Sequence, residues 1–362
     1  MKKYIFFVIF LFSFCFDICF ALCEKSQSCV LIDNDSGRVL YSKNKDSKKL
    51  IASTTKLMTF LVAYENGNLD NQYEAGEEIL KMYGTSIYLS LGEKMNLRDL
   101  LYGLILRSGN DASVVIANNI GKNYDEFILS MNKRSKELGM KNTIFFNPHG
   151  LDEETENYST SYDMALLSRY LHKIPFYLEV SSTKHYKTNT DLKAYDWYNR
   201  NKLLSQYEYA ISGKNGYTPN AGKTLVSGAL KGNLSLSAVS LDDNDIYSTH
   251  IALYEYGFSK YSNYNILNKD VFSYKDKNYK GQLYIKNSFS YPVSEEEKKD
   301  IEIVIQIIRN VNVNETDKVG SVIVYFNKEE IHRENLFLKV NVTEKTKSFF
   351  EKIWDFFNSL IS

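Results

Sequence analysis

Three short strings of residues, far apart in the chain but in a fixed order, limit what this sequence can be. They are Ser53-Thr54-Thr55-Lys56, Ser108-Gly109-Asn110 and Lys214-Asn215-Gly216. They contain two serines, two lysines and asparagine amides, which are residue types that serve in acyl transfer. Together they supply the parts for nucleophilic attack by a serine, without a histidine as the base.

The first string needs support from its surroundings, because Ser-x-x-Lys also occurs elsewhere. The four such strings of the chain begin at Ser42, Ser53, Ser130 and Ser181. Only Ser53 precedes an apolar run, residues 57–63, that is closed by Gly67. A serine before such a run and a glycine after it are typical start and stop signals of a helix. An ordinary helix N-cap is therefore the alternative to a nucleophile, and the other two strings favour the nucleophile.

The spacing within the first string gives Ser53 a base. Residues three apart on a helix share one face, with roughly 5–6 Å between their Cβ atoms, so Lys56 can reach the Ser53 hydroxyl. A lysine acts as a base only when it is neutral. Burial, a second cation and the N-terminal end of a helix all lower the pKa of a lysine. We expect Lys214 to be that second cation.

The other residues of the strings fit the later steps of acyl transfer. Ser108 would relay a proton to the leaving amine, and Asn110 would hydrogen-bond the base and the substrate amide. Lys214 would bind the terminal carboxylate of the substrate. A tetrahedral intermediate needs two preorganised donors for its oxyanion. The backbone N–H groups of Ser53 and Tyr217 would supply them.

The passages around these strings resemble the D-alanyl-D-alanine carboxypeptidases, the low-molecular-mass penicillin-binding proteins. The resemblance covers residues 30–230 and is carried by 31–33, 37–40, 100–104, 107–112, 146–151 and 158–160. It implies a serine peptidase that removes the C-terminal D-alanine from peptidoglycan stem pentapeptides through an acyl-enzyme at Ser53. It also implies covalent inhibition by penicillin and other β-lactam antibiotics. Water and the amine of another stem peptide are both open as acceptors.

One position departs from the family pattern. The family usually has threonine between the lysine and glycine of the third string, where this chain has Asn215. An asparagine still offers a donor and an acceptor, and Thr218 follows soon after. We therefore expect Asn215, Gly216, Tyr217 and Thr218 to bind substrate, with activity retained.

Two other functions compete with this interpretation. A serine β-lactamase of class A would need a deacylating Glu ahead of a Leu-Asn, and no glutamate has that pair at the required spacing. A catalytically weak protein that binds penicillin or peptidoglycan is favoured only by Asn215. All the other residues needed for acylation are present, so the carboxypeptidase is the stronger prediction.

The pattern of the elements predicts a mixed α/β (α+β) fold with two domains. The chain has a strand-like stretch at 28–40, helical patterns at 97–106, 111–120, 124–138 and 161–171, and strands again at 213–216, 224–230 and 234–240. This order favours a sheet with a helical cluster and the site between them. This matches the β-lactamase/transpeptidase-like fold that the resemblance implies, over residues 24–265. Short β-rich runs occur at 271–274, 281–286, 301–308, 321–326 and 337–340. Ile301, Ile303, Ile305 and Ile307 alternate with other residues, as in a half-buried strand. Residues 268–340 are therefore predicted to form a small β-sandwich-like domain.

The two ends of the chain predict an exported protein on a membrane surface. Lys2-Lys3, an apolar block and Ala21 describe a signal peptide over residues 1–21; a retained anchor is the alternative. Residues 343–362 carry aromatic and aliphatic side chains at helical spacing, which is typical of a helix lying in the membrane interface; docking on the protein itself is the alternative. We expect the enzyme on the outer face of the cytoplasmic membrane, held peripherally and facing the cell wall.

The composition narrows the other possibilities. The chain has 44 basic and 44 acidic residues, so no net charge favours binding to nucleic acid. The five histidines show no paired metal-binding spacing, and we expect neither a metal nor another cofactor. Cys23 and Cys29 remain after removal of the signal peptide. They could form a disulfide outside the cell or stay as free thiols.

Overall fold

The computed structural model describes residues 22–277, 279, 281–308 and 318–339. The larger of the two domains contains a five-stranded antiparallel sheet in the order β2-β1-β11-β10-β9. The sheet combines strands from the beginning and from the end of that domain's sequence. Its strands are β1 (Ser26–Asp33), β2 (Val39–Lys43), β9 (Ala210–Thr218), β10 (Gly222–Lys231) and β11 (Leu234–Asp243). The N-terminal strand β1 pairs with the late strand β11, so residues about two hundred positions apart form the middle of the sheet.

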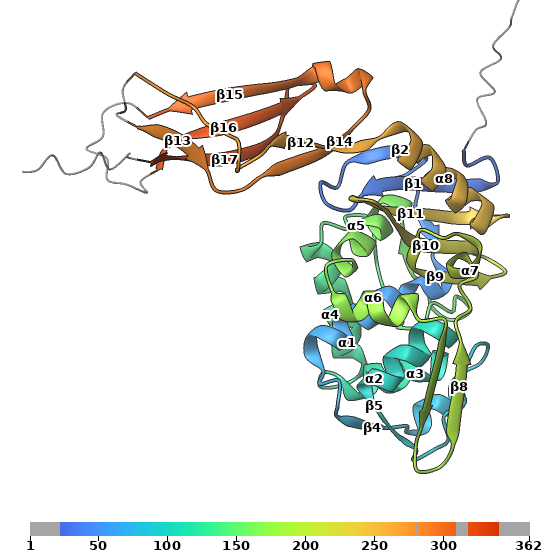
Figure 1. The fold of residues 1–362 in the computed structure, drawn as a ribbon. Helices are drawn as coiled ribbons and strands as arrows, with labels where there is room; N and C mark the ends of the chain where they lie inside the picture. The colour runs from blue at the N-terminus through green and yellow to red at the C-terminus, as the bar shows by residue number, and fades with distance from the viewer. Residues whose placement is uncertain (1–21, 278, 280, 309–317, 340–362) are drawn as a thin grey trace, which may run out of the picture.

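Both faces of this sheet are buried, and successive side chains point to opposite faces. Val30 and Ile32 of β1 belong to the core beneath the helical cluster, with α5 (Ser161–Leu171) packed against the sheet. Leu31, between them, belongs to the core under α8 (Ile246–Lys260). Figure 1 shows the resulting layers, with α8 on one side of the sheet and the helical cluster on the other.

The helical cluster is built around α1 (Lys56–Asn66), which follows a short 3-10 turn at Ala52–Thr55. Every side chain from Leu57 to Ala63 is buried, because α1 is covered by α3, α4, α5 and a π-helical turn. The other helices are α2 (Leu97–Tyr102), the π-helical turn Gly103–Arg107, α3 (Asn110–Asn119), α4 (Tyr124–Glu137), α6 (Pro175–Ser182) and α7 (Leu203–Gln206). A helix that is apolar all round is expected in such a central position.

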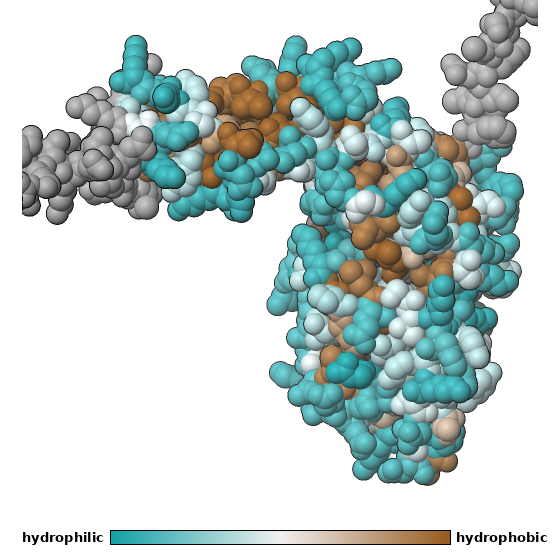
Figure 2. All heavy atoms as spheres, in the orientation of Figure 1, coloured by the Kyte–Doolittle hydropathy of each residue, from teal (hydrophilic) through white to brown (hydrophobic). Residues whose placement is uncertain are grey.

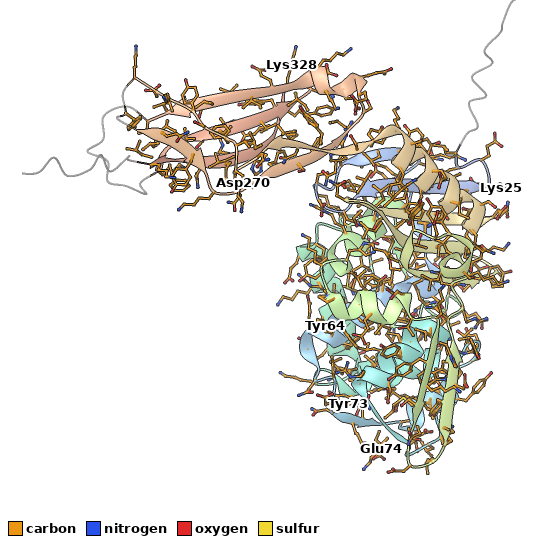
Figure 3. The ribbon with its side chains drawn as sticks, viewed as in Figure 1. Lys25, Tyr64, Tyr73, Glu74, Asp270 and Lys328 are labelled. Carbon is orange, nitrogen blue, oxygen red and sulfur yellow. A yellow bond between two sulfur atoms is a disulfide. The ribbon has the colours of Figure 1, made fainter. Side chains whose placement is uncertain are left out.

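Short paired strands complete the larger domain. They are β3 (Lys49–Leu50) with β6 (Tyr158–Ser159), β4 (Gln72–Glu74) with β5 (Lys94–Asn96), and β7 (His185–Asn189) with β8 (Ala194–Tyr198). A 3-10 turn, η2, spans Glu77–Lys81. In Figure 3, Tyr73 and Glu74 mark the end of this domain that lies away from the sheet, while Lys25 lies beside β1.

The second domain is all β. Its four-stranded sheet has the order β13-β17-β16-β15, and β12 pairs with β14. The bounds are β12 (Ser262–Leu267), β13 (Gln282–Ile285), β14 (Phe289–Val293), β15 (Ile301–Ile307), β16 (Lys318–Phe326) and β17 (Glu329–Lys339), with a 3-10 turn at Glu296–Asp300. This domain projects sideways from the sheet end of the larger one (Figure 1). Hydrophobic residues gather over β15 and β16 on the face seen in Figure 2, and Ile303 of β15 is 47% exposed.

Arg38 connects the two domains. Its guanidinium donates to the backbone oxygen of Pro292 at 2.5 Å and pairs with Glu297 at 2.6 Å. It also lies over the ring of Phe326, 4.5 Å from the centroid. An arginine that satisfies its donors while stacking on aromatic rings loses little freedom per bond formed, so this contact fixes where the second domain begins.

The predicted fold class is confirmed as a mixed domain followed by an all-β domain. Cys23 and Cys29, for which two states were open, are joined by a disulfide. The predicted signal peptide and the predicted membrane helix at 343–362 lie outside the described residues. Within the described part of the chain, none of the helices has the length and apolar character needed to cross a bilayer.

Several local predictions were wrong or incomplete. The single helix expected at 97–106 is divided into α2 and a π-helical turn that ends at Ser108. No strand forms at 271–274, where Tyr274 makes only an isolated bridge to Leu283. The hairpin of β7 and β8 and the helix α6 were not predicted.

Candidate active site

The 3-10 turn that carries Ser53 is pressed between two backbone segments. Gly150 has φ +84°, and a Cβ there would lie 1.9 Å from the oxygen of Ala52. Gly216 of β9 approaches from the other side, where a Cβ would lie 2.7 Å from the nitrogen of Ser53. Only glycine allows backbone to approach this closely. The position of Ser53 is therefore set by a loop on one side and a strand on the other.

Lys56 begins α1 one turn after Ser53 and is completely buried. Its Nζ lies 2.9 Å from Ser53 Oγ, 2.7 Å from Asn110 Oδ1 and 2.6 Å from the backbone oxygen of His149. Burial, and after it the charge of Lys214, holds the pKa of Lys56 well below its usual range. The sequence-based prediction of a lowered pKa thus agrees with the surroundings of this side chain.

The three partners determine how a neutral Lys56 is oriented. A neutral amine has two N–H donors and one lone pair, whereas a carbonyl oxygen only accepts. Asn110 Nδ2 donates to the backbone oxygen of Tyr83 at 2.7 Å, which fixes Oδ1 as the amide atom facing Lys56. The two N–H groups of Lys56 then point to Asn110 and His149. Its lone pair is left for the hydroxyl proton of Ser53, which is the arrangement that a general base requires.

Ser108 and Asn110 are placed by the break between the π-helical turn and α3. Ser108 has φ +63°, a left-handed conformation that costs energy in a residue other than glycine. Its backbone oxygen accepts from Thr85 Oγ1 at 2.6 Å. The carboxylate of Asp111 accepts from the backbone N–H groups of Ile87 and Leu89, both at 3.0 Å. These bonds hold the loop after Gly84 against the start of α3.

Lys214 lies on β9 and is 1% exposed. Its Nζ donates to the backbone oxygen of Asn215 at 2.6 Å. Burial, together with the nearby charge of Arg200, lowers the pKa of Lys214 to about 7. The side chain of Tyr217 is 65% exposed, so its backbone rather than its ring belongs to the site. The hydroxyl of Thr218 donates to Asp152 Oδ2 at 2.6 Å, a partner that the sequence did not predict.

A cavity of about 200 Å³ brings most of the predicted residues together. Lys56 and Lys214 are buried beside it and are not part of its lining. The lining residues are Ser53, Gly84, Thr85, Ser108, Asn110, Leu151, Arg200, Asn215, Gly216, Tyr217 and Thr218.

Two residues of the site, Arg200 and His149, were not predicted to belong to it. Arg200 is exposed, lines the cavity and lowers the pKa of both buried lysines. It stands fourteen positions before Lys214, and a lone arginine after a surface hairpin gives no signal in one sequence. His149 was interpreted as a turn residue. It does lie in a turn, and its backbone oxygen is also a partner of Lys56.

Comparison with known proteins decides the family. The model of the D-alanyl-D-alanine carboxypeptidase family matches residues 22–245, and that of the penicillin-binding protein 5 C-terminal domain matches residues 261–344. The chain belongs to the D-alanyl-D-alanine carboxypeptidase family. The three motif strings and the helix-covered sheet therefore occur here in the context in which this family carries out serine-dependent peptide hydrolysis.

Individual carboxypeptidases align over most of the chain. It is 33% identical to the D-alanyl-D-alanine carboxypeptidase DacF of Bacillus subtilis over 318 residues, 83% of this chain and 81% of that protein. It is 28% identical to DacC of Escherichia coli, covering 91% of this chain and 87% of that protein. Penicillin-binding protein 5 from Haemophilus influenzae has a similar structure, with a TM-score of 0.70 and 25% identity, over 88% of this chain and 97% of that one.

A solved transpeptidase resembles the larger domain alone. The DD-transpeptidase of Streptomyces K15 has a TM-score of 0.62 and is 30% identical, over 65% of this chain and 97% of its own. Proteins named as carboxypeptidases and a protein named as a transpeptidase therefore share this fold. The choice between water and an amine as acceptor depends on details finer than the fold.

Proposed function

We propose that this D-alanyl-D-alanine carboxypeptidase uses Ser53 as nucleophile and Lys56 as general base. The observation that carries the proposal is the orientation of Lys56, whose two N–H donors are taken by Asn110 and His149. Lys56 removes the Ser53 proton while Ser53 Oγ attacks the carbonyl carbon of the penultimate D-alanine. The backbone N–H groups of Ser53 and Tyr217 stabilise the oxyanion. The C–N bond then breaks, D-alanine leaves, and water hydrolyses the acyl-enzyme.

Ser108 serves as the proton relay to the leaving amine. Its side chain is 5% exposed and lines the same cavity as Ser53, so it lies near the bond that breaks. Asn110 holds Lys56 in place through Oδ1 and offers its amide to the substrate backbone. A relay is needed because the base has just received the proton that the departing D-alanine requires.

Cationic residues at one side of the cavity bind the carboxylate of the substrate. Lys214 is buried on β9 beside the cavity, and Arg200 and Asn215 line the cavity directly. Among the described residues, the Arg200 guanidinium forms no ion pair within 4.0 Å, which leaves it available to a carboxylate. Asn215 takes the place of the usual threonine, and Gly216 and Thr218 complete this wall. A guanidinium binds a carboxylate through two parallel N–H donors.

Penicillin is proposed to acylate the same serine. A β-lactam presents a strained amide carbonyl beside a carboxylate, so it meets Ser53 and the cationic wall in the same order as the D-Ala-D-Ala terminus. The acyl-enzyme keeps the rest of the antibiotic attached, because the amine that would leave is part of the same molecule.

We also propose that the enzyme works outside the cell at the membrane surface. The relatives are named as D-alanyl-D-alanine carboxypeptidases and as penicillin-binding protein 5, which is consistent with export to the cell wall. Residues 1–21 would direct export, and residues 343–362 would hold the mature protein on the outer face of the cytoplasmic membrane.

Release of free D-alanine from a pentapeptide ending in D-Ala-D-Ala tests the mechanism. The mature chain and a Ser53→Ala variant are compared, with covalent penicillin labelling measured on both. We expect release and labelling from the unchanged chain only. Equal release by the Ser53→Ala variant would exclude Ser53 as nucleophile. Labelling at Ser53 without D-alanine release would mean that acylation occurs and that the natural substrate is different.

A further inference from the structure

A second and larger cavity lies beside the active-site cavity, since Tyr83 lines the second cavity and the next residue, Gly84, lines the first. Its volume is about 520 Å³, and Leu151 lines both cavities. The wall combines apolar, amide and charged side chains from η2, α3, α4 and the loop before β6. Its residues are Glu78, Lys81, Met82, Tyr83, Val114, Asn118, Tyr124, Phe146, Asn147, His149, Leu151, Glu154 and Thr155.

Two walls of this second cavity are bonded directly to the catalytic side chains. The backbone oxygen of Tyr83 accepts from Asn110 Nδ2 at 2.7 Å. The backbone oxygen of His149 accepts from Lys56 Nζ at 2.6 Å, and the same Nζ lies 2.9 Å from Ser53 Oγ. A ligand in this cavity would therefore touch His149, which stands two hydrogen bonds from the nucleophile, and Tyr83, which stands three from it through Asn110 and Lys56.

The ring of His149 offers a donor to the cavity. Its side chain is 8% exposed, and Nδ1 accepts the backbone N–H of Leu151 at 3.1 Å. The proton of the neutral ring is then on Nε2. Among the described residues, no hydrogen bond to Nε2 is found, although the ring lines the cavity. Nε2 is not among the fully buried atoms that lack a partner, so its N–H is open to the cavity. It can therefore donate to an oxygen acceptor of a ligand.

The remaining polar groups of the wall require both charges in a ligand. Lys81 offers an ammonium group, while Glu78 and Glu154 offer carboxylates. One oxygen of Glu78 accepts the backbone N–H of Gly76 at 2.9 Å. The lining also includes apolar side chains, among them Met82 and Val114. The wall thus matches an aliphatic chain whose end carries an ammonium and a carboxylate together.

We propose that this cavity binds the side chain of the stem-peptide residue that precedes D-Ala-D-Ala, and that it selects a zwitterionic end on that side chain. The inference rests on the proposed carboxypeptidase function. The terminal carboxylate of the substrate faces Arg200, so the rest of the peptide leaves the active-site cavity along another wall, where Leu151 leads into the second cavity. The preceding residue is the first to reach it. Its carboxylate meets His149 Nε2 and Lys81, and its ammonium meets Glu154 and Glu78.

Occupation of the cavity also reaches the catalytic step. A side chain held against Tyr83 and His149 restrains the two backbone oxygens that orient Asn110 and Lys56. Binding energy from a part of the substrate that does not react can in this way raise kcat as well as lower KM. A cavity that the substrate does not occupy would affect neither kcat nor KM.

The test compares pentapeptides that differ only at the third position. One series carries meso-diaminopimelate, with both charges on the side chain, a second lysine, with the ammonium only, and a third norleucine, with neither. N-acetyl-D-Ala-D-Ala, which lacks this residue, reports the reaction independently of the cavity. We expect kcat/KM to fall in that order, with a drop of about tenfold for each charged group lost, the size expected of one charge-assisted contact.

Variants of the wall identify the cavity as the cause. In Glu154→Gln and Lys81→Gln, the ratio of kcat/KM between the diaminopimelate and norleucine peptides should fall by about tenfold. Glu156→Gln is the matched control, because Glu156 lies in the same loop, is exposed and does not line the cavity. Lys122→Gln serves in the same way for Lys81. Both controls should keep the ratio of the unchanged enzyme.

Each outcome decides the proposal. Equal kcat/KM for the three pentapeptides, with all of them hydrolysed, would overturn the subsite and leave the carboxypeptidase function intact. A preference for diaminopimelate that survives in Glu154→Gln and Lys81→Gln would place recognition elsewhere and also overturn it. No hydrolysis of any pentapeptide or of N-acetyl-D-Ala-D-Ala would overturn the proposed function, and the subsite with it.

Discussion

Replacement of Gly150 by alanine is expected to disable catalysis by moving the turn that carries Ser53. The new Cβ would lie 1.9 Å from the Ala52 oxygen and 2.9 Å from Thr55 Oγ1, whereas real Cβ contacts stay above 3.0 Å. The two segments must separate by at least 1.1 Å, the difference between 3.0 Å and 1.9 Å. A misplacement of about 1 Å in a catalytic group costs on the order of 100-fold in rate. We therefore expect kcat for D-alanine release to fall about 100-fold.

The same substitution also has a backbone cost that must be separated from this effect. An alanine at φ +84° is strained by about 1–2 kcal/mol wherever it occurs. Gly139 provides the control, because its φ is +79° and a Cβ there has nothing within 4 Å. Gly139→Ala should lose about the same stability in a urea titration and keep its kcat.

The comparison of the two variants is decisive when both are folded, as judged by thermal unfolding. If Gly150→Ala released D-alanine at the rate of Gly139→Ala, the contact between Gly150 and Ala52 would not position the nucleophile. A large loss of kcat in Gly139→Ala would show instead that backbone strain alone lowers the activity.

Other predictions follow from the buried charges and the chain end. Lys56→Ala should abolish covalent penicillin labelling, and full labelling would exclude Lys56 as the base. Because the pKa of Lys214 is lowered to about 7, its positive charge is lost as the pH rises through 7, and KM should increase above that pH; a flat profile from pH 6 to 8.5 would argue against its role. Burial lowers the pKa of His172 to about 4 and of His250 to about 3. The unfolded chain binds these protons below pH 6.5, so the free energy of unfolding should fall by about 2 kcal/mol for each histidine between pH 6.5 and 5, and equal urea midpoints would contradict this. Removal of residues 343–362 should release the exported protein from membranes, and continued pelleting would exclude that segment as the anchor.

The sequence predicted the site best where chemistry requires a particular side chain. Ser53, Ser108 and Asn110 line one cavity, and Lys56 and Lys214 are buried beside it. The strand at 301–307 was also predicted, because its alternation survives in β15. The break at Ser108 was not predicted. Residues 97–106 have helical periodicity throughout, and the π-helical turn exists because Thr85, distant in sequence, holds the backbone oxygen of Ser108.

The hairpin of β7 and β8 shows a second reason for the failures. Its strands alternate between exposed residues and inner residues, which are partly buried in β7 and buried in β8. Their inner side chains pack on the helical cluster, where the Tyr186 and Tyr102 rings stack at 3.7 Å. Strand formation here depends on that tertiary contact rather than on local preference. Arg200, which follows this hairpin, was missed with it.

Backbone groups explain the part of the site that no side-chain motif could show. Every residue has a backbone carbonyl oxygen, so the residue type at position 149 gives no sign that its oxygen orients Lys56. The residue type at position 83 is equally uninformative, although the backbone oxygen of Tyr83 accepts from the amide of Asn110. The serine-lysine pair works as nucleophile and base only when the other donors of the lysine are occupied. The two loops that occupy them, directly or through Asn110, also form the second cavity. Substrate selection and activation of the nucleophile are therefore carried by the same two segments of backbone.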